Sequence, residues 1–133
     1  MRNRRLASFA IPAALVTTVI ASAIPAQAAT KPAVNSNSTC SLGSVSNLQV
    51  QREDNGKLSI DFGIDMTAHT AGVKWSYHVT DNRSLVTRGI SSTVSDGSFS
   101  ITRAITPRSG TNHIVATAKN SATGETCRIS VIG

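Results

Sequence analysis

The sequence predicts an all-β protein, an antiparallel sandwich of seven strands in two sheets. No segment of the chain keeps the apolar spacing of a surface helix for more than two turns. Apolar and polar residues instead alternate with period two in several segments, as they do in strands that have one buried face. Clusters of turn-forming residues separate these segments at intervals typical of sandwiches.

The composition fits one folded domain. The chain has 133 residues, of which 40% are hydrophobic and 15% are charged. Disorder usually requires lower hydropathy together with a high net charge. Two cysteines exclude a dense disulfide scaffold and a complete four-cysteine zinc site.

The first 28 residues have the layout of a secretory signal peptide. Three arginines precede an uncharged apolar run, and Ala26-Gln27-Ala28 is a small-x-small cleavage site. Polar residues and prolines interrupt the run, which argues against a membrane anchor of about 20 strongly apolar residues. We expect cleavage between Ala28 and Ala29, by Sec or twin-arginine export, and a secreted, extracellular protein with no membrane insertion.

Export changes the charge balance of the chain. The formal net charge is +6, from 13 basic and 7 acidic residues, and removing three arginines leaves 10 − 7 = +3. The remaining basic residues are spread from Lys31 to Arg128 without a run. A nucleic-acid interface would need a basic stripe with aromatic stacking partners, so we expect no nucleic-acid partner.

The mature chain divides into a flexible spacer and the sandwich domain. Residues 29–39 are small, polar and aperiodic, and residues 40–133 form the predicted domain. The strongest strand has apolar residues at the even positions of 58–66. The seven expected strands are Val45–Arg52, Leu58–Met66, Val73–Val79, Leu85–Ser91, Phe99–Ile105, His113–Lys119 and Cys127–Val131. Their inward positions predict a core of Leu48, Val50, Ile60, Phe62, Ile64, Trp75, Tyr77, Phe99, Ile101, Ile114, Ala116 and Ile129.

The first hairpin is expected to have a three-residue loop, Asp54-Asn55-Gly56. A two-residue loop at Asn55-Gly56 would pair odd positions with even ones and turn the apolar residues of the two strands to opposite faces. The longer loop places Val50 opposite Ile60 on one face, with Gly56 in the left-handed conformation.

The cysteines are expected to form a single disulfide. An exported protein meets an oxidising environment, and Cys40 and Cys127 are the only cysteines in the chain.

Seven short strands with a tryptophan on the third resemble an immunoglobulin-like sandwich. Residues 116–124 resemble the sixth strand and the following turn of immunoglobulin and fibronectin type III domains. More narrowly, the chain is similar to a family of small secreted actinobacterial proteins with no assigned activity. The shared pattern is Cys40, Trp75, Gly97-Ser98-Phe99 and Ala122-Thr123-Gly124-Glu125-Thr126-Cys127.

This resemblance implies a fold and no function, and it departs from the antibody pattern. Phe62 and Ala116 occupy the positions of the antibody disulfide, and the sixth strand has no tyrosine. The resemblance places Cys40 and Cys127 at the same end of the sandwich. A bridge across that sequence separation would contribute about 4–5 kcal/mol in the loop-entropy description.

The chemistry of an enzyme is missing from the sequence. His69, His78 and His113 lie on three separate segments, and no hydrolase, zinc-protease or phosphate-loop motif is present. Asp61 and Asp65 share one strand face about 13 Å apart, farther than the carboxylates of glycosidases. We expect no catalysis, no cofactor and no metal site.

A rigid scaffold with recognition loops remains as the functional expectation. The candidate loops are Thr67–Gly72, the turn at Asp81 and Asn120–Glu125. We expect a monomeric, non-enzymatic binding scaffold whose partner, a protein or a cell surface, the sequence does not identify.

Two alternatives to this scaffold are a small-ligand carrier and a carbohydrate-binding module. Carriers such as the apoproteins of antitumour chromoproteins share the sandwich but usually carry two disulfides and a wide cleft. A carbohydrate module usually offers exposed aromatic residues. Here the aromatic residues share parity with aliphatic neighbours and are expected in the core.

Overall fold

The computed structural model describes residues 33–133 as eight antiparallel strands without a helix. The strands are β1 (Val34–Thr39), β2 (Val45–Arg52), β3 (Leu58–Asp65), β4 (Lys74–Asp81), β5 (Ser84–Ser92), β6 (Ser98–Ile105), β7 (His113–Asn120) and β8 (Thr126–Ile132). No helix in this range is long and apolar enough to cross a membrane. The expected signal peptide and its cleavage site between Ala28 and Ala29 lie outside the described residues.

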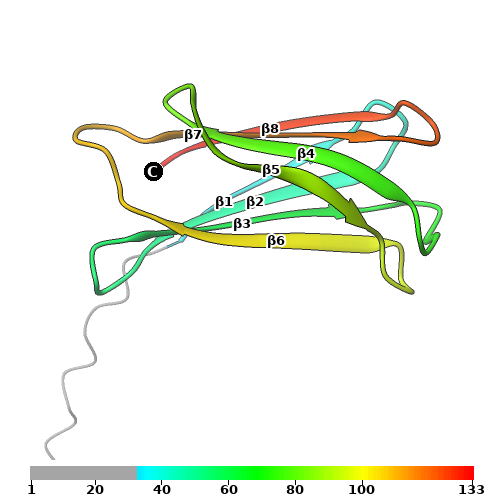
Figure 1. Ribbon diagram of the computed structural model, residues 1–133, viewed down its shortest axis with the longest axis horizontal. Helices are drawn as coiled ribbons and strands as arrows, with labels where there is room; N and C mark the ends of the chain where they lie inside the picture. The colour runs from blue at the N-terminus through cyan, green and yellow to red at the C-terminus, as the bar shows by residue number, and fades with distance from the viewer. Residues whose placement is uncertain (1–32) are drawn as a thin grey trace, which may run out of the picture.

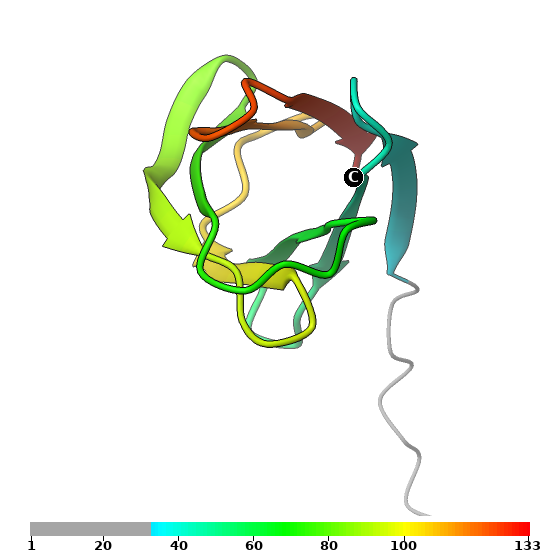
Figure 2. The same ribbon diagram turned by 90° about the vertical axis from the view of Figure 1, so that its right-hand side faces the viewer.

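The strands form two four-stranded sheets that pack face to face (Figure 1). One sheet has the order β1-β2-β3-β6 and the other has the order β5-β4-β7-β8. Figure 2 looks along the strands and shows both sheets around a single interior, with β1 beside β8. The predicted all-β sandwich is confirmed, with one strand more than expected.

The additional strand is β1, which lies in the segment expected to be a spacer. It pairs with β2 along its whole length, from Val34 opposite Val50 to Thr39 opposite Val45. Its sequence, VNSNST, carries almost no apolar alternation, and none of its side chains is fully buried at this edge of the sheet. Backbone hydrogen bonds hold such an edge strand, and these leave no signature in the side chains. The sandwich therefore includes Val34–Thr39, which were expected to be part of the spacer.

The first hairpin has the predicted register and loop. Val50 lies opposite Ile60, and the Glu53 N–H donates to the Lys57 carbonyl at 2.8 Å. Gly56 has φ of 80°, in the left-handed region that closes a three-residue loop with a bulge. The parity of the apolar positions was therefore sufficient to choose between two loop lengths.

The core is buried as predicted, with one exception. Trp75 has 0% of its surface exposed, and its ring centroid lies 6.2 Å from that of Phe99. Tyr77 is only half-buried, because it lies opposite Gly89 on the edge strand β5. A Cβ at position 89 would lie 2.8 Å from the Tyr77 hydroxyl oxygen, so glycine leaves room for the tyrosine to reach the edge of the sheet. The other eleven predicted core residues are all buried.

The predicted disulfide joins the two sheets at one end of the sandwich. Cys40 follows β1, Cys127 lies in β8, and their Cα atoms are 4.5 Å apart. The bridge closes a sequence separation of 87 residues. It therefore forms the covalent link between the first and last strands of the domain.

A buried glutamate completes this corner of the sandwich. Glu125 is 3% exposed, and its Oε2 accepts hydrogen bonds from the backbone N–H groups of Leu42, at 2.9 Å, and Ser44, at 3.0 Å. The Ser44 hydroxyl donates to Oε1 at 2.6 Å. Ser41 and Thr126 exchange two further hydrogen bonds beside the disulfide. A buried carboxylate with three donors is well satisfied, so Glu125 fastens the β1–β2 loop to β8.

Replacing Trp75 tests the core. Trp75→Ala is expected to lower the free energy of unfolding by about 3–5 kcal/mol because it removes a large buried ring. Trp75→Phe should lose less, since it keeps part of the ring contact and removes an indole N–H that has no hydrogen-bond partner among residues 33–133. Urea denaturation followed by circular dichroism measures both losses. Solvent-like tryptophan emission from the wild-type protein, with a fully stable alanine variant, would contradict the buried position.

Replacing Glu125 tests the corner. Glu125→Ala leaves two backbone N–H groups and one hydroxyl without their acceptor, and should destabilise the oxidised protein by about 3 kcal/mol. Glu53→Ala, in the exposed first hairpin, is the matched control and should change stability by about 0.5 kcal/mol or less. Equal small losses in thermal denaturation of both variants would show that Glu125 does not fasten the corner.

Candidate functional site

The two outer faces of the sandwich differ in charge. On the β5-β4-β7-β8 sheet, the strand alternation turns four basic side chains outward, and we call this surface the cationic face. Its basic residues are Lys74, Arg88, Lys119 and Arg128. None of the seven acidic residues lies on this face. Asp61 and Asp65 lie on the outer face of the other sheet, Asp81 and Glu125 are buried, and Glu53, Asp54 and Asp96 lie in turns.

Strand register aligns part of the cationic face into one row. His78 of β4 pairs with Arg88 on one side and with Thr117 on the other, and Thr117 pairs with Arg128. Directly opposite residues have Cβ atoms about 4.5–5.5 Å apart. The row therefore crosses all four strands, and three strand spacings separate its terminal arginines by about 14 Å.

Two shallow hollows follow this row on either side of β4. One, of about 520 Å³, includes Thr117, Lys119 and Arg128 in its lining. The other, of about 580 Å³, includes Leu85, Arg88 and Ile90. Both hollows are lined by Ser76, Tyr77 and His78. They therefore meet over β4 and leave a surface that an extended ligand could follow.

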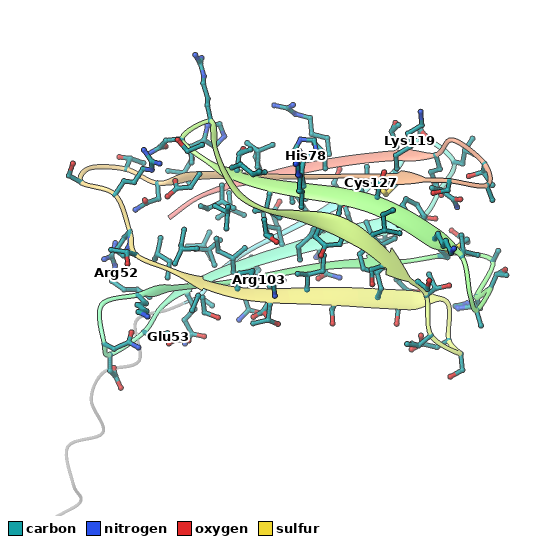
Figure 3. The ribbon with its side chains drawn as sticks, viewed as in Figure 1. Arg52, Glu53, His78, Arg103, Lys119 and Cys127 are labelled. Carbon is teal, nitrogen blue, oxygen red and sulfur yellow. A yellow bond between two sulfur atoms is a disulfide. The ribbon has the colours of Figure 1, made fainter. Side chains whose placement is uncertain are left out.

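The imidazole of His78 is held in position on this face. The Thr117 hydroxyl oxygen lies 2.8 Å from Nδ1 of His78, so neighbouring strands fix the ring between them. His78 and Lys119 both lie on the side of their sheet that faces away from the sandwich interior (Figure 3). Imidazole and hydroxyl groups thus lie between the basic side chains of the cationic face.

The three loops predicted as recognition sites do not come together. Thr67–Gly72 and Asn120–Glu125 lie at the end with the disulfide, and the Asp81 turn lies at the opposite end (Figure 1). The first loop is fixed by Thr93, whose Oγ1 donates to the Thr70 carbonyl at 2.6 Å and accepts from the Val73 N–H at 3.0 Å. These hydrogen bonds hold the Thr67–Gly72 loop against the neighbouring loop that contains Thr93.

The other two loops are held by asparagines. Oδ1 of Asn82 accepts from the His113 N–H at 2.9 Å, and its amide donates to the Thr111 carbonyl at 3.0 Å. Asn120 is buried and accepts from the Ala122 N–H at 2.8 Å. These side chains stabilise the turns rather than pointing toward a common ligand.

A buried aspartate lies beside the turn at Asn82. Asp81 is 2% exposed, and its Oδ1 has no hydrogen-bond partner among the described residues. It lines a small hollow of about 230 Å³ together with Arg108. Burial raises the pKa of the Asp81 carboxyl, and the attraction of Arg108 opposes that rise without cancelling it.

Within residues 33–133 the histidines and carboxylates form no cluster that could hold a metal ion. His69, His78 and His113 stay on separate elements, and no three potential metal ligands of this part of the chain lie together.

Comparison of the chain with protein-family models, with curated proteins and with solved structures finds no match in any of the three.

Sequence reasoning missed the cationic face because its members come from four separate strands. In the sequence, Arg88, Lys119 and Arg128 are charges spread along the chain without a run. Each of these residues occupies an outward position in the alternation of its own strand, and this pattern indicates from the sequence that the side chain is exposed. Their alignment depends on the register of β4 with β5 and β7, which the sequence does not display.

The pH dependence of stability tests the environment of Asp81. Its pKa in the folded protein is raised, so the folded state binds the proton more tightly than the unfolded state does. The buried charge therefore lowers the free energy of unfolding to its full extent at pH values above the raised pKa. This destabilisation disappears as the pH falls below the ordinary pKa of aspartate. Asp81→Asn should stabilise the protein at pH 7, and this gain should shrink at pH 3.

Urea denaturation of wild type and variant at the two pH values measures this difference. Asp65→Asn is the control because its side chain is exposed on the other sheet, and it should change stability by about 0.5 kcal/mol or less. A loss of stability in Asp81→Asn at pH 7 would contradict a desolvated carboxylate.

Proposed function

We propose that the protein is a secreted, non-enzymatic binding protein that attaches to a protein or cell-surface partner through the cationic face. One observation carries the proposal: four strands turn Lys74, Arg88, Lys119 and Arg128 onto one surface on which no acidic residue lies. Like charges on neighbouring strands repel one another, so the arrangement does not serve the stability of the fold. An oppositely charged partner would relieve that repulsion.

The scaffold beneath this face favours binding over catalysis. The sheet is hydrogen-bonded along four strands, and the Cys40–Cys127 bridge ties it to the second sheet. A rigid surface loses little conformational entropy when a partner binds. Both hollows are open at the surface, and no carboxylate lines them to orient the imidazole of His78 beside the Thr117 hydroxyl, which supports recognition without chemistry.

The small-ligand carrier is the weaker alternative. Carriers enclose most of the ligand surface in a concave site. Here the space between the sheets is filled by buried side chains such as Phe62, Trp75 and Phe99, and the larger hollows are open at the surface. A carbohydrate module with an aromatic platform is also disfavoured, because among residues 33–133 Phe62, Trp75 and Phe99 are buried and Tyr77 is only half-exposed.

Binding of the secreted protein to intact producing cells and their wall fraction tests the proposal. The wild-type protein should sediment with the cells, and the triple variant Arg88→Ser, Lys119→Ser, Arg128→Ser should bind at least tenfold less. The matched control replaces Arg52, Lys57 and Arg103, which lie outside the cationic face, with serine. Figure 3 shows Arg52 and Arg103 on the opposite sheet from His78.

The control removes the same charge and should bind like the wild type. Equal loss in both variants would show a response to net charge alone. Failure of the wild-type protein to bind any fraction would reject attachment to the cell surface.

A further inference from the structure

We infer that the partner of the cationic face is an acidic polysaccharide, a linear sugar chain with repeated carboxylates that lies across the strands along the row from Arg88 to Arg128. This inference rests on the proposed binding function and adds the chemistry of the partner. The choice of an acidic polysaccharide rests on charge complementarity, on the polar groups between the basic side chains and on the shape of the surface.

The charges of the row suit a chain with repeated anionic groups. Arg88 and Arg128 lie at its two ends, about 14 Å apart, and Lys119 lies beside Arg128 on the adjacent strand. A guanidinium presents parallel N–H donors that match the two oxygens of a carboxylate. A single small anion would reach only one end of this row, whereas a repeating chain can reach both.

The groups between the charges suit sugar hydroxyls. Ser76, His78, Thr117 and Thr126 lie between or beside the basic residues, and each offers a hydroxyl or an imidazole to the outer surface. The two hollows that meet over β4 run along the same direction as the row. Neutral hydrogen bonds of this kind would add to the charge contacts without an aromatic platform.

Other anionic macromolecules fit the face less well. Single-stranded nucleic acid is usually held by stacking of its bases on aromatic rings, and Phe62, Trp75 and Phe99 are all buried. Membrane surfaces usually attract clustered basic residues together with apolar residues that insert. The exposed apolar side chains of this face form no single patch: Leu85 and Ile90 lie on the edge strand β5, and Ile132 lies at the end of β8, the opposite edge of the sheet.

Binding to polygalacturonate, which has one carboxylate on each sugar, tests the inference. Calorimetry at 50 mM and 200 mM NaCl should show binding that weakens at least tenfold with salt. Neutral dextran should not bind. The double variant Arg88→Ser, Arg128→Ser should weaken binding at least tenfold, and the control Arg52→Ser, Arg103→Ser should leave it unchanged.

A second variant separates sugar recognition from charge alone. Thr117→Val with Ser76→Ala keeps every charge and removes one hydroxyl from the row and one beside it, and it should weaken polygalacturonate binding severalfold. Unchanged binding in this variant would overturn the role of the hydroxyls. Equal affinity for duplex DNA or for phosphatidylglycerol vesicles at the same salt would overturn the choice of a polysaccharide.

The result with whole cells distinguishes this inference from the proposed function. If the protein binds cells through the cationic face but does not bind polygalacturonate, the inferred partner chemistry is wrong and the binding function stands. If the serine variants of the face still bind cells like the wild type, both are wrong.

Discussion

The corner that joins the two sheets is the constraint on which the rest of the structure depends. Cys40 and Cys127 link the loop after β1 to β8, and Glu125 holds the same loop through three hydrogen bonds. The bridge closes 87 residues of sequence, so it removes much of the freedom of the unfolded chain. A domain of this size has only about 5–15 kcal/mol of stability, so a contribution of a few kcal/mol is a large share.

Strand pairing within the second sheet accounts for the charged surface on its outside. Backbone pairing of β5, β4, β7 and β8 fixes the basic side chains in register, and the buried side chains beneath them hold the sheet in place. The opposite sheet carries Asp61 and Asp65 outward, so the two outer faces have opposite charge. The cationic face therefore lies on paired strands that cannot easily rearrange to avoid the repulsion between their basic side chains.

Much of the fold could be predicted from local patterns. Period-two alternation identified the buried faces and parity identified the loop at Gly56. The cysteine count, together with the expectation of export, predicted the disulfide. The edge strand β1 could not be predicted because backbone hydrogen bonds hold it. The half-buried position of Tyr77 depends on Gly89 of a neighbouring strand. The candidate site could not be predicted because the register between strands brings its basic residues together. The sequence shows the pattern of each strand only by itself.

Amide hydrogen exchange before and after reduction of the disulfide measures most directly whether the corner holds the sheets together. The slowest amides report global opening of the domain, and those of β4 and β7 in the centre of the second sheet should be among them. Loss of about 2–5 kcal/mol on reduction should accelerate their exchange by roughly 30-fold or more. Unchanged exchange of these amides in the reduced protein would contradict the account, because the two sheets would then be held together without the link.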